Sequence, residues 1–235
     1  FKLSESNRAD KFVRTGHPEL DALMARFPRV FDGQCKIMKG GQHHIELEPF
    51  AKPVCSGALR NVAEPQKEAL KKELDDLVRQ DIIEFVEGPS EWLHPIVIVP
   101  KKDGNIRMCV DLTKLNKYIK RPVNPQPTPW EVVRTVPKGK KHFAVFDALK
   151  GYHQIELDEE SKALTTFLTP FGRFRYKRLP MGESDAGDVF TLRYGLAVDV
   201  ATDGRRTTED TLLIGDTFHE LLANTEEFFR AFLNT

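Results

Sequence analysis

The sequence predicts an α+β protein in which helices pack on a mostly antiparallel sheet. Short, branched segments bounded by Gly, Pro, Asp or Asn alternate with segments of helical period along the 235 residues. The order strand, helix, strand, strand, helix in the second half is typical of this class. Hydrophobic residues make up 40% of the chain and aromatic residues 9%, which is enough for a substantial core.

The first sixty residues are expected to form a leader rather than a domain. One short helix is predicted over residues 18–27, and the pieces after it are extended and punctuated by Gly and Pro. Residues 63–79 then carry Leu70, Leu74 and Val78 with Glu and Lys between them, which is the spacing of an amphipathic helix.

Three short strands of a small antiparallel sheet are expected next, at residues 82–86, 95–99 and 107–112. Residues 101–104, KKDG, predict a hairpin turn with Asp-Gly at its tip. Residues 121–130 hold four prolines and predict an extended connector. This connector is the best candidate for an internal boundary.

The second half repeats the alternation of strands and helices. The expected elements are a buried strand at 142–146, a strand pair at 165–168 and 173–177, a helix at 184–198, two short strands near Arg206 and Leu212, and a final helix at 218–233.

Charge is balanced overall, since 35 Lys and Arg face 35 Asp and Glu, so the net charge favours no class of partner. Its distribution is uneven. Residues 101–150 hold twelve basic residues against four acidic ones, and residues 183–235 hold four against eleven. A basic block suits a nucleic acid or nucleotide and an acidic block suits divalent cations, although solvated surfaces explain both on charge alone.

The three cysteines, Cys35, Cys55 and Cys109, are widely spaced and indicate neither a disulfide framework nor a zinc site. No run approaches the ~20 apolar residues of a membrane span, and the polar N-terminus is unlike a signal peptide. We therefore expect an intracellular protein that does not contact a membrane. The chain starts with Phe, which suggests a piece of a longer polypeptide.

Acidic residues stand where two separate strands end. Asp147 follows the strand KHFAVF, and Glu209 and Asp210 lie between two short apolar segments, as in a hairpin turn. Phosphoryl transfer with two Mg²⁺ ions ~3.5–4 Å apart needs carboxylates from separate strand ends. From the residues alone, a strand-end aspartate and a solvated turn are the simpler interpretation.

Four motifs in order resemble those of reverse transcriptases from gypsy-type LTR retrotransposons. They are PKKDGNIRMCVDLTKLN at 100–116, FDALKGYHQI at 146–155, TTFLTPFGRFRYKRL at 165–179 and PMGESDAGDVF at 180–190. The similarity covers roughly residues 25 to 235. It implies the fingers and palm of an RNA-directed DNA polymerase, with an antiparallel palm sheet packed on helices and the thumb absent.

The resemblance also implies a division of the chain. The expected segments are an N-terminal leader wrapping the fingers at 1–62, the first part of the fingers at 63–124, the first part of the palm at 125–160, the return strands of the fingers at 161–182, and the palm with a YxDD-like hairpin and a final helix at 183–235.

The metal ligands implied by the resemblance are Asp147, Glu209, Asp210 and the backbone carbonyl of Ala148. Together they would hold Mg²⁺ or Mn²⁺. The palm hairpin of the family carries an aromatic residue and two aspartates, whereas this chain has Thr207 at the aromatic position and Glu209 at the first acidic one. The longer side chain of Glu209 moves its carboxylate by about one C–C bond, while tolerances at such sites are ~0.5 Å.

Five further residues match nucleotide-binding positions of the family. Tyr152 matches the aromatic gate that excludes a 2′-hydroxyl, although by itself it reads as a core tyrosine. Lys102 and Arg107 match the fingers residues that clamp the triphosphate, although a basic hairpin by itself is ordinary surface. Met181 and Gly182 match the segment lining the nucleotide and template side of the pocket. In addition, Glu183 stands where the family commonly has an apolar residue.

Three functions remain open from the sequence. The first is a DNA polymerase that copies RNA or DNA, with a template-primer, dNTP and the rest of the polyprotein (thumb, ribonuclease H and integrase) as partners. The second is a catalytically impaired fingers-palm module that binds nucleic acid or assembles with protein, and the third is a plain α+β interaction domain. An oligomer is compatible with each. We expect an intracellular, cytoplasmic location, with virus-like particles or the nucleus as alternatives.

Overall fold

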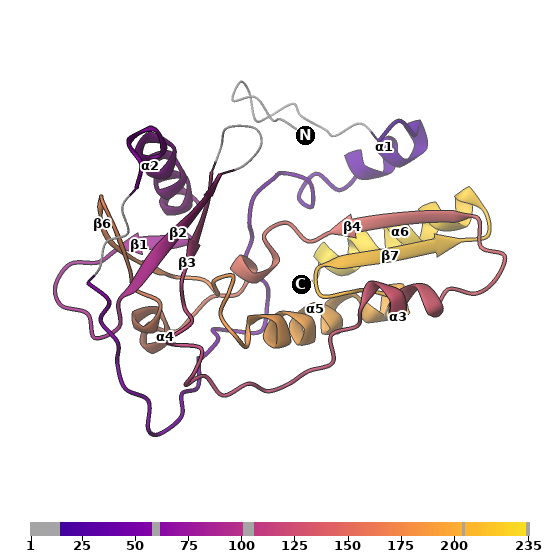
Figure 1. Ribbon diagram of the computed structural model, residues 1–235. Helices are drawn as coiled ribbons and strands as arrows, with labels where there is room; N and C mark the ends of the chain where they lie inside the picture. The colour runs from indigo at the N-terminus through magenta and orange to yellow at the C-terminus, as the bar shows by residue number, and fades with distance from the viewer. Residues whose placement is uncertain (1–14, 58–61, 101–105, 204, 234–235) are drawn as a thin grey trace. The chain divides into compact units, whose positions relative to one another are not determined.

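The computed structural model describes residues 15–57, 62–100, 106–203 and 205–233. The chain divides into two compact units, each assembled from separate stretches of sequence. The first unit consists of residues 1–34, 126–149 and 191–235, and the second unit consists of residues 35–125 and 150–190. Figure 1 labels their helices and strands.

The second unit is built on a five-stranded sheet with the order β1-β6-β5-β2-β3. Neighbouring strands are antiparallel except β2 and β5, which run parallel. Its elements are α2 (Glu64–Arg79), β1 (Ile83–Phe85), β2 (His94–Pro100), β3 (Ile106–Val110), the 3-10 helix η1 (Gly151–Gln154), α4 (Glu159–Leu164), β5 (Phe167–Thr169) and β6 (Gly172–Tyr176).

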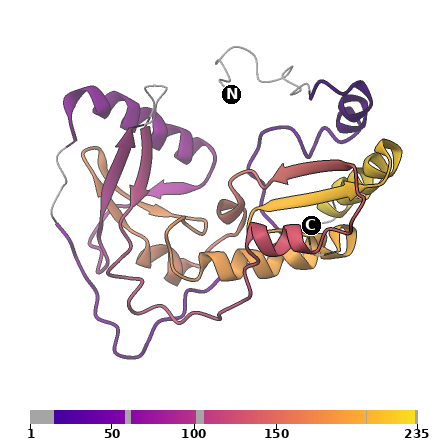
Figure 2. The same cartoon turned by 45° about the vertical axis from the view of Figure 1, so that its right-hand side comes forward.

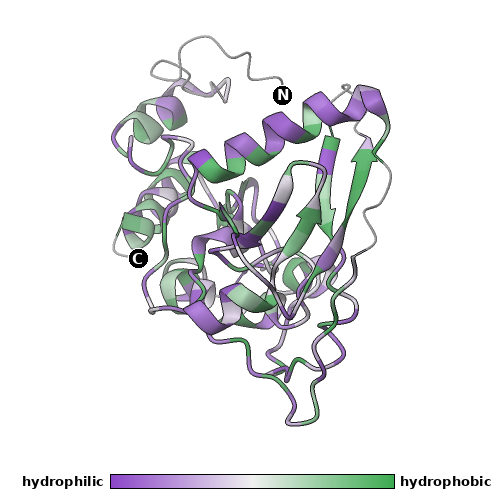
Figure 3. Cartoon of the chain, turned by 90° about the vertical axis from the view of Figure 1, so that its left-hand side faces the viewer, coloured by the Kyte–Doolittle hydropathy of each residue, from purple (hydrophilic) through white to green (hydrophobic). Residues whose placement is uncertain are grey.

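Helix α2 packs on this sheet with an apolar stripe. Leu70, Leu74 and Leu77 are buried, and the helix contacts β1 and β3. The predicted helix is confirmed, but Leu77 rather than Val78 completes the stripe, because Val78 remains 44% exposed. Figure 3 shows hydrophilic and hydrophobic residues alternating along this helix, as its amphipathic sequence requires.

Residues 35–57 cross the second unit as an extended strap. The strap adds no strand to the sheet, but isolated bridges pin it to three separate places: His43 to Leu157, Leu47 to Ile119, and Cys55 to Leu93. The expected extended leader is therefore tied into this unit by backbone hydrogen bonds.

The first unit contains a two-stranded antiparallel sheet with α6 against one face (Figures 1 and 2). Its elements are α1 (Pro18–Ala25), α3 (Pro129–Arg134), β4 (His142–Asp147), α5 (Ala186–Thr202), which belongs to this unit from residue 191 onward, β7 (Asp210–Gly215) and α6 (Phe218–Leu233).

Only one face of β4 is covered. Phe146 packs on Phe228 and Phe229 of α6, with ring centroids 5.5 and 5.2 Å apart. On the opposite face Phe143 and Val145 are 52% and 65% exposed. The prediction of a buried strand is thus right for one face and wrong for the other.

Two other details differ from the sequence prediction. The expected strand near Arg206 is an isolated bridge to Thr211. The proline-rich connector is extended only to residue 128, because α3 begins at Pro129, where a missing N–H costs nothing. Thr128 and Glu131 form a capping box there, with reciprocal hydrogen bonds of 3.3 and 2.7 Å.

Cys35, Cys55 and Cys109 are free thiols. Across the part of the chain that the structure describes, no helix has both the length and the apolar character to cross a membrane.

Candidate metal and nucleotide site

Strands β4 and β7 bring two aspartates face to face. Asp147, the last residue of β4, is the register partner of Asp210, the first residue of β7. Directly opposed residues of antiparallel strands share one face of the sheet, with Cβ atoms ~4.5–5.5 Å apart. The predicted convergence of the strand-end aspartate with the acidic turn is confirmed for this pair.

The two carboxyls repel each other. The pKa of Asp147 is raised above its ordinary value, first because the carboxyl is partly desolvated and second because Asp210 carries a like charge. Both residues are nevertheless open to solvent. A pair of facing oxygen donors that solvent can reach suits a hard divalent cation such as Mg²⁺ or Mn²⁺.

A two-residue turn carries Glu209 beside this pair. Thr208 and Glu209 form its tip, and the Thr207 amide closes it by donating to the Asp210 carbonyl at 2.8 Å. The Asp210 amide donates to the Thr207 hydroxyl at 3.2 Å. The Glu209 carbonyl accepts from the amide of Ala148 at 3.1 Å, so the turn is tied to the residue after β4.

Among the described residues, Asp147 and Asp210 are not part of a larger cluster of metal-binding side chains. Within residues 15–57, 62–100, 106–203 and 205–233, no three or more His, Cys, Asp or Glu side chains are grouped so that they could hold a metal ion. Asp147 and Asp210 therefore offer a two-carboxylate site. Participation of the Glu209 side chain and of the Ala148 carbonyl stays a prediction.

Tyr152 lies in the second unit, in η1, and is half-buried. Its ring meets the ring of Phe190 edge-on, with centroids 5.5 Å apart. Phe190 in turn lies over Gly151, where a Cβ atom would come within 2.7 Å of Cζ of Phe190. The glycine before Tyr152 is therefore what makes room for the ring that supports the tyrosine.

Met181 and Gly182 lie on a loop of the second unit. Met181 is 54% exposed, and Gly182 has φ +89°, a conformation that favours glycine. Asn116 holds the loop from both sides, because its side-chain amide donates to the Gly182 carbonyl at 2.8 Å and its side-chain oxygen accepts from the Ser184 amide at 3.0 Å.

Arg107 is exposed on β3, where it is the register partner of Val99. Lys102 and the predicted hairpin at 101–104 lie outside the described residues. A triphosphate clamp made of Lys102 and Arg107 therefore stays a prediction.

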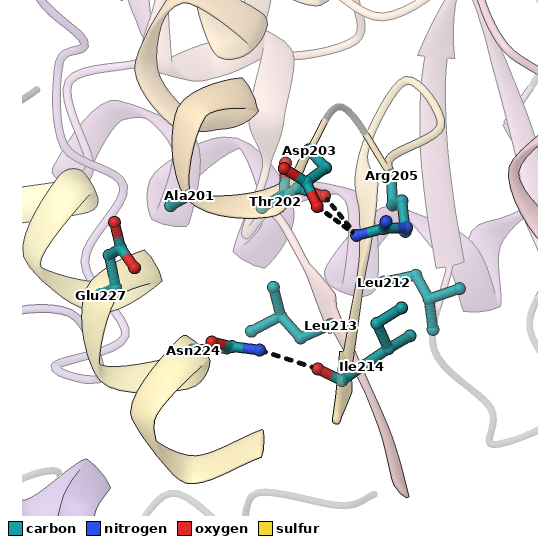
Figure 4. A pocket seen from close by; sticks show the side chains of 9 residues that line it. All are labelled: Ala201, Thr202, Asp203, Arg205, Leu212, Leu213, Ile214, Asn224 and Glu227. Carbon is teal, nitrogen blue, oxygen red and sulfur yellow. Dashed lines mark hydrogen bonds and ion pairs between the residues drawn. The ribbon is translucent and has the colours of Figure 1, made fainter. Parts of the chain in front are cut away.

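A separate polar hollow opens elsewhere in the first unit (Figure 4). Its lining includes Arg205, which pairs with Asp203 at 2.9 Å, and Asn224, whose side-chain amide donates to the Ile214 carbonyl at 2.9 Å. Of the predicted site residues that the structure describes, none lines this hollow.

The middle of the chain matches a family model described as "Reverse transcriptase (RNA-dependent DNA polymerase)", over residues 99–192. Residues 99–192 thus match a reverse transcriptase domain. Curated relatives include a retrovirus-related Pol polyprotein from transposon 412 of Drosophila melanogaster, 28% identical over 172 residues, and the transposon Tf2-3 polyprotein of Schizosaccharomyces pombe, 28% identical over 193 residues. These matches cover 70% and 78% of this chain but only 14% of each relative.

Solved structures give the fold of the reverse transcriptase domain. Prototype foamy virus protease-reverse transcriptase matches with a TM-score of 0.80 and 21% identity, over 92% of this chain and 29% of that chain. Another match is a foamy viral protease-reverse transcriptase in complex with an RNA/DNA hybrid, with a TM-score of 0.77, 21% identity, and coverage of 92% and 30%. The predicted fold class, an α+β fingers and palm, is confirmed.

Glu183 of the reverse transcriptase domain lies where an apolar residue was expected, and it is buried. Burial, together with a hydrogen bond to Asp185 and the charge of that residue, raises the pKa of Glu183. Nε2 of His43 lies 3.2 Å from Oδ2 of Asp185. At neutral pH Glu183 is thus a neutral carboxylic acid, which replaces an apolar side chain at a smaller cost than an anion would.

Four residues that support the acidic turn were not predicted from the sequence. They are Tyr194, Gly195 and Asp199, together with Arg206 at the start of the turn. The available signal was a glycine inside an apolar helical pattern, which often marks close packing.

Proposed function

We propose that this reverse transcriptase domain carries out template-directed DNA synthesis at the Asp147–Asp210 pair. The observation that carries the proposal is the register pairing of these two aspartates at adjacent strand ends. The RNA/DNA hybrid bound by a foamy viral relative supports a template-primer as the nucleic-acid partner. Because the chain spans 14% of its curated relatives, we place the thumb, ribonuclease H and integrase in the rest of a polyprotein.

In the proposed reaction the primer 3′-hydroxyl oxygen forms a bond to the α-phosphorus of a dNTP. The bond between that phosphorus and the bridging oxygen to the β-phosphate breaks, pyrophosphate leaves, and the hydroxyl proton passes to solvent. Asp147 and Asp210, joined by Glu209 and the Ala148 carbonyl, would hold Mg²⁺ or Mn²⁺. A bound divalent ion would neutralise charge on the triphosphate and lower the pKa of the attacking hydroxyl.

We infer the nucleotide contacts from residues of the second unit that match nucleotide-binding positions of reverse transcriptases. Tyr152, held by Phe190, presents an aromatic ring that would pack under the sugar and exclude a 2′-hydroxyl. Arg107 and Lys102 would pair with the triphosphate oxygens, since guanidinium and ammonium groups suit those anions. Met181 and Gly182 would line the nucleotide and template side, on the loop that Asn116 holds.

Mn²⁺ binding and primer extension test this proposal together. Asp147→Asn and Asp210→Asn should each weaken Mn²⁺ binding by at least about tenfold, because each removes one of two facing charges. Asp203→Asn is the matched control, since Asp203 is an exposed aspartate of the same unit that pairs with Arg205. Equal Mn²⁺ affinity in the native protein and in Asp147→Asn would remove the proposed site.

A catalytically impaired module is the second candidate, and one observation favours it. The Glu209 side chain does not join Asp147 and Asp210 in a group of three metal-binding side chains among the described residues. Such a module would bind template-primer with an affinity that falls steeply with salt, because Lys and Arg displace counterions from phosphates, yet would incorporate no nucleotide. Incorporation by the native chain would exclude it.

A further inference from the structure

Helix α5 contacts both sides of the acidic turn. Arg206 precedes the turn, Thr211 follows Asp210, and these two flanking residues are bridge partners of each other. Successive residues of a strand point to opposite faces, so Thr211 faces the covered side of the sheet while Asp210 faces the open side. Contacts on the covered side of the sheet therefore determine the position of the turn.

The first contact is an ion pair. Arg206 is buried, and its Nε and Nη2 atoms donate to the two carboxylate oxygens of Asp199 at 2.6 and 3.1 Å. Its guanidinium carbon also lies 5.8 Å from the centre of the Tyr194 ring. A two-bond arginine–carboxylate pair fixes direction as well as distance, so it holds Arg206 in one orientation.

Gly195 makes this ion pair sterically feasible. A Cβ atom at residue 195 would lie 1.9 Å from Nη2 of Arg206 and 2.8 Å from a carboxylate oxygen of Asp199. Glycine in a helix interior is otherwise unfavourable relative to alanine. Glycine at the point of closest approach thus leaves the space that the Arg206 guanidinium needs beside α5.

The second contact is a hydrogen bond. The Tyr194 hydroxyl lies 2.7 Å from the Thr211 hydroxyl, and both side chains are fully enclosed. No water competes for either group there, so breaking the bond leaves buried polar atoms unpaired. Tyr194 thus holds Thr211, the residue after the turn, and Asp199 holds Arg206, the residue before it.

We propose that α5 is a two-point clamp, made of Asp199–Arg206 and Tyr194–Thr211, that positions Glu209 and Asp210 relative to Asp147. The clamp residues touch no substrate and act through the turn, so they are positioning residues. Their role in metal binding rests on the function proposed above, whereas their hold on the turn does not.

Two variants and a matched control test the clamp in this chain. Gly195→Ala displaces the Arg206 guanidinium while adding a better helix former, so it leaves α5 intact. Tyr194→Phe removes the second contact by deleting one oxygen. Arg205→Met is the control, because it removes the neighbouring arginine, whose partner is Asp203 (Figure 4).

Hydrogen exchange of the amides of residues 207–211 reports the hold on the turn, and Mn²⁺ titration reports the acidic site. We expect both variants to speed exchange of the turn by about tenfold and to raise the Mn²⁺ dissociation constant several-fold, with neither change in the control. Unchanged exchange in Gly195→Ala and Tyr194→Phe would overturn the clamp, whatever the Mn²⁺ result. Faster exchange without Mn²⁺ binding in the native chain would overturn the metal role alone and leave the clamp standing.

Discussion

Asp147 at the end of β4 and Asp210 at the start of β7 are register partners on the exposed face of the sheet. The pKa of Asp147 is raised there. Partial burial is the larger cause and the charge of Asp210 the smaller one. A carboxyl that is harder to ionise holds its proton to higher pH, so protons and metal ions compete for it in a higher pH range than for an ordinary aspartate.

This competition gives a first prediction. Asp210→Asn should lower the pKa of Asp147, because it removes the like charge, but not to the ordinary value, because the burial remains. The measurement is a pH titration of the Asp147 carboxyl by carbon NMR. Asp203→Asn, which lies outside the pair, should leave the titration curve where it is. A rise in the pKa of Asp147 would contradict the assigned cause.

Glu209 supplies the second prediction. We expect Glu209→Asp to increase Mg²⁺-dependent nucleotide incorporation by the full-length parent, because the shorter side chain restores the usual carboxylate position. A misplacement of ~1 Å can cost on the order of 100-fold in rate. Single-turnover incorporation at saturating Mg²⁺ measures the effect, and Glu209→Gln, which keeps the length but loses the charge, is the control. Robust native incorporation that falls in Glu209→Asp would show that the turn is adapted to glutamate.

The third prediction concerns the packing of Tyr152. Tyr152→Ala should admit ribonucleotides in an active parent, since the proposed gate is then missing. Gly151→Ala should weaken sugar discrimination in the same direction but less, because the new Cβ atom pushes Phe190 away from the tyrosine it supports. The ratio of dNTP to rNTP incorporation measures both. Discrimination that survives Tyr152→Ala would assign Tyr152 to the core alone.

The fourth prediction is a pH dependence of stability at Glu183. Its folded pKa is raised, while an unfolded glutamate titrates near ~4.3. The folded state therefore holds a proton that the unfolded state has released, so this contribution to stability is present below that pH and is lost as pH rises. Asp185, His43 and Arg121 also face this region.

Urea denaturation from pH 4 to pH 9 measures this effect, since the linkage is spread over roughly that range. The free energy of unfolding should fall less with rising pH in Glu183→Gln than in the native chain, because glutamine keeps a hydrogen-bond donor and does not titrate. Identical slopes would place the titrating group elsewhere.

Much of the fold could be predicted because local signals agree with it. Residues 64–79 and 218–233 are helical where amphipathic spacing predicts helices, and β4 lies at the predicted strand. The parallel pairing of β2 with β5 could not be predicted, since its register joins His94 to Phe167 across distant sequence. Pairing between strands that are so far apart in sequence produces no local sequence pattern.

Helix α3 was missed although its sequence carries a signal. The prolines of residues 121–130 favour an extended chain, but the pattern Thr128, Pro129, Glu131 is that of a capped helix start. For the site, Asp147 and Asp210 were found from strand ends and motif resemblance. The clamp was not, because Arg206 and Asp199 become partners only once the turn lies on α5.

The turn between Thr207 and Asp210 contains only Thr208 and Glu209. This short length limits the insertions and deletions that the turn can accept. Side chains alternate between the faces of β7 residue by residue, so a one-residue shift in register would turn Asp210 toward the covered face and Thr211 toward solvent. A one-residue slip in one direction would place Thr211 opposite Asp147, and a slip in the other direction would place Glu209 there. The number of residues in this loop is therefore as much a part of the site as their chemistry.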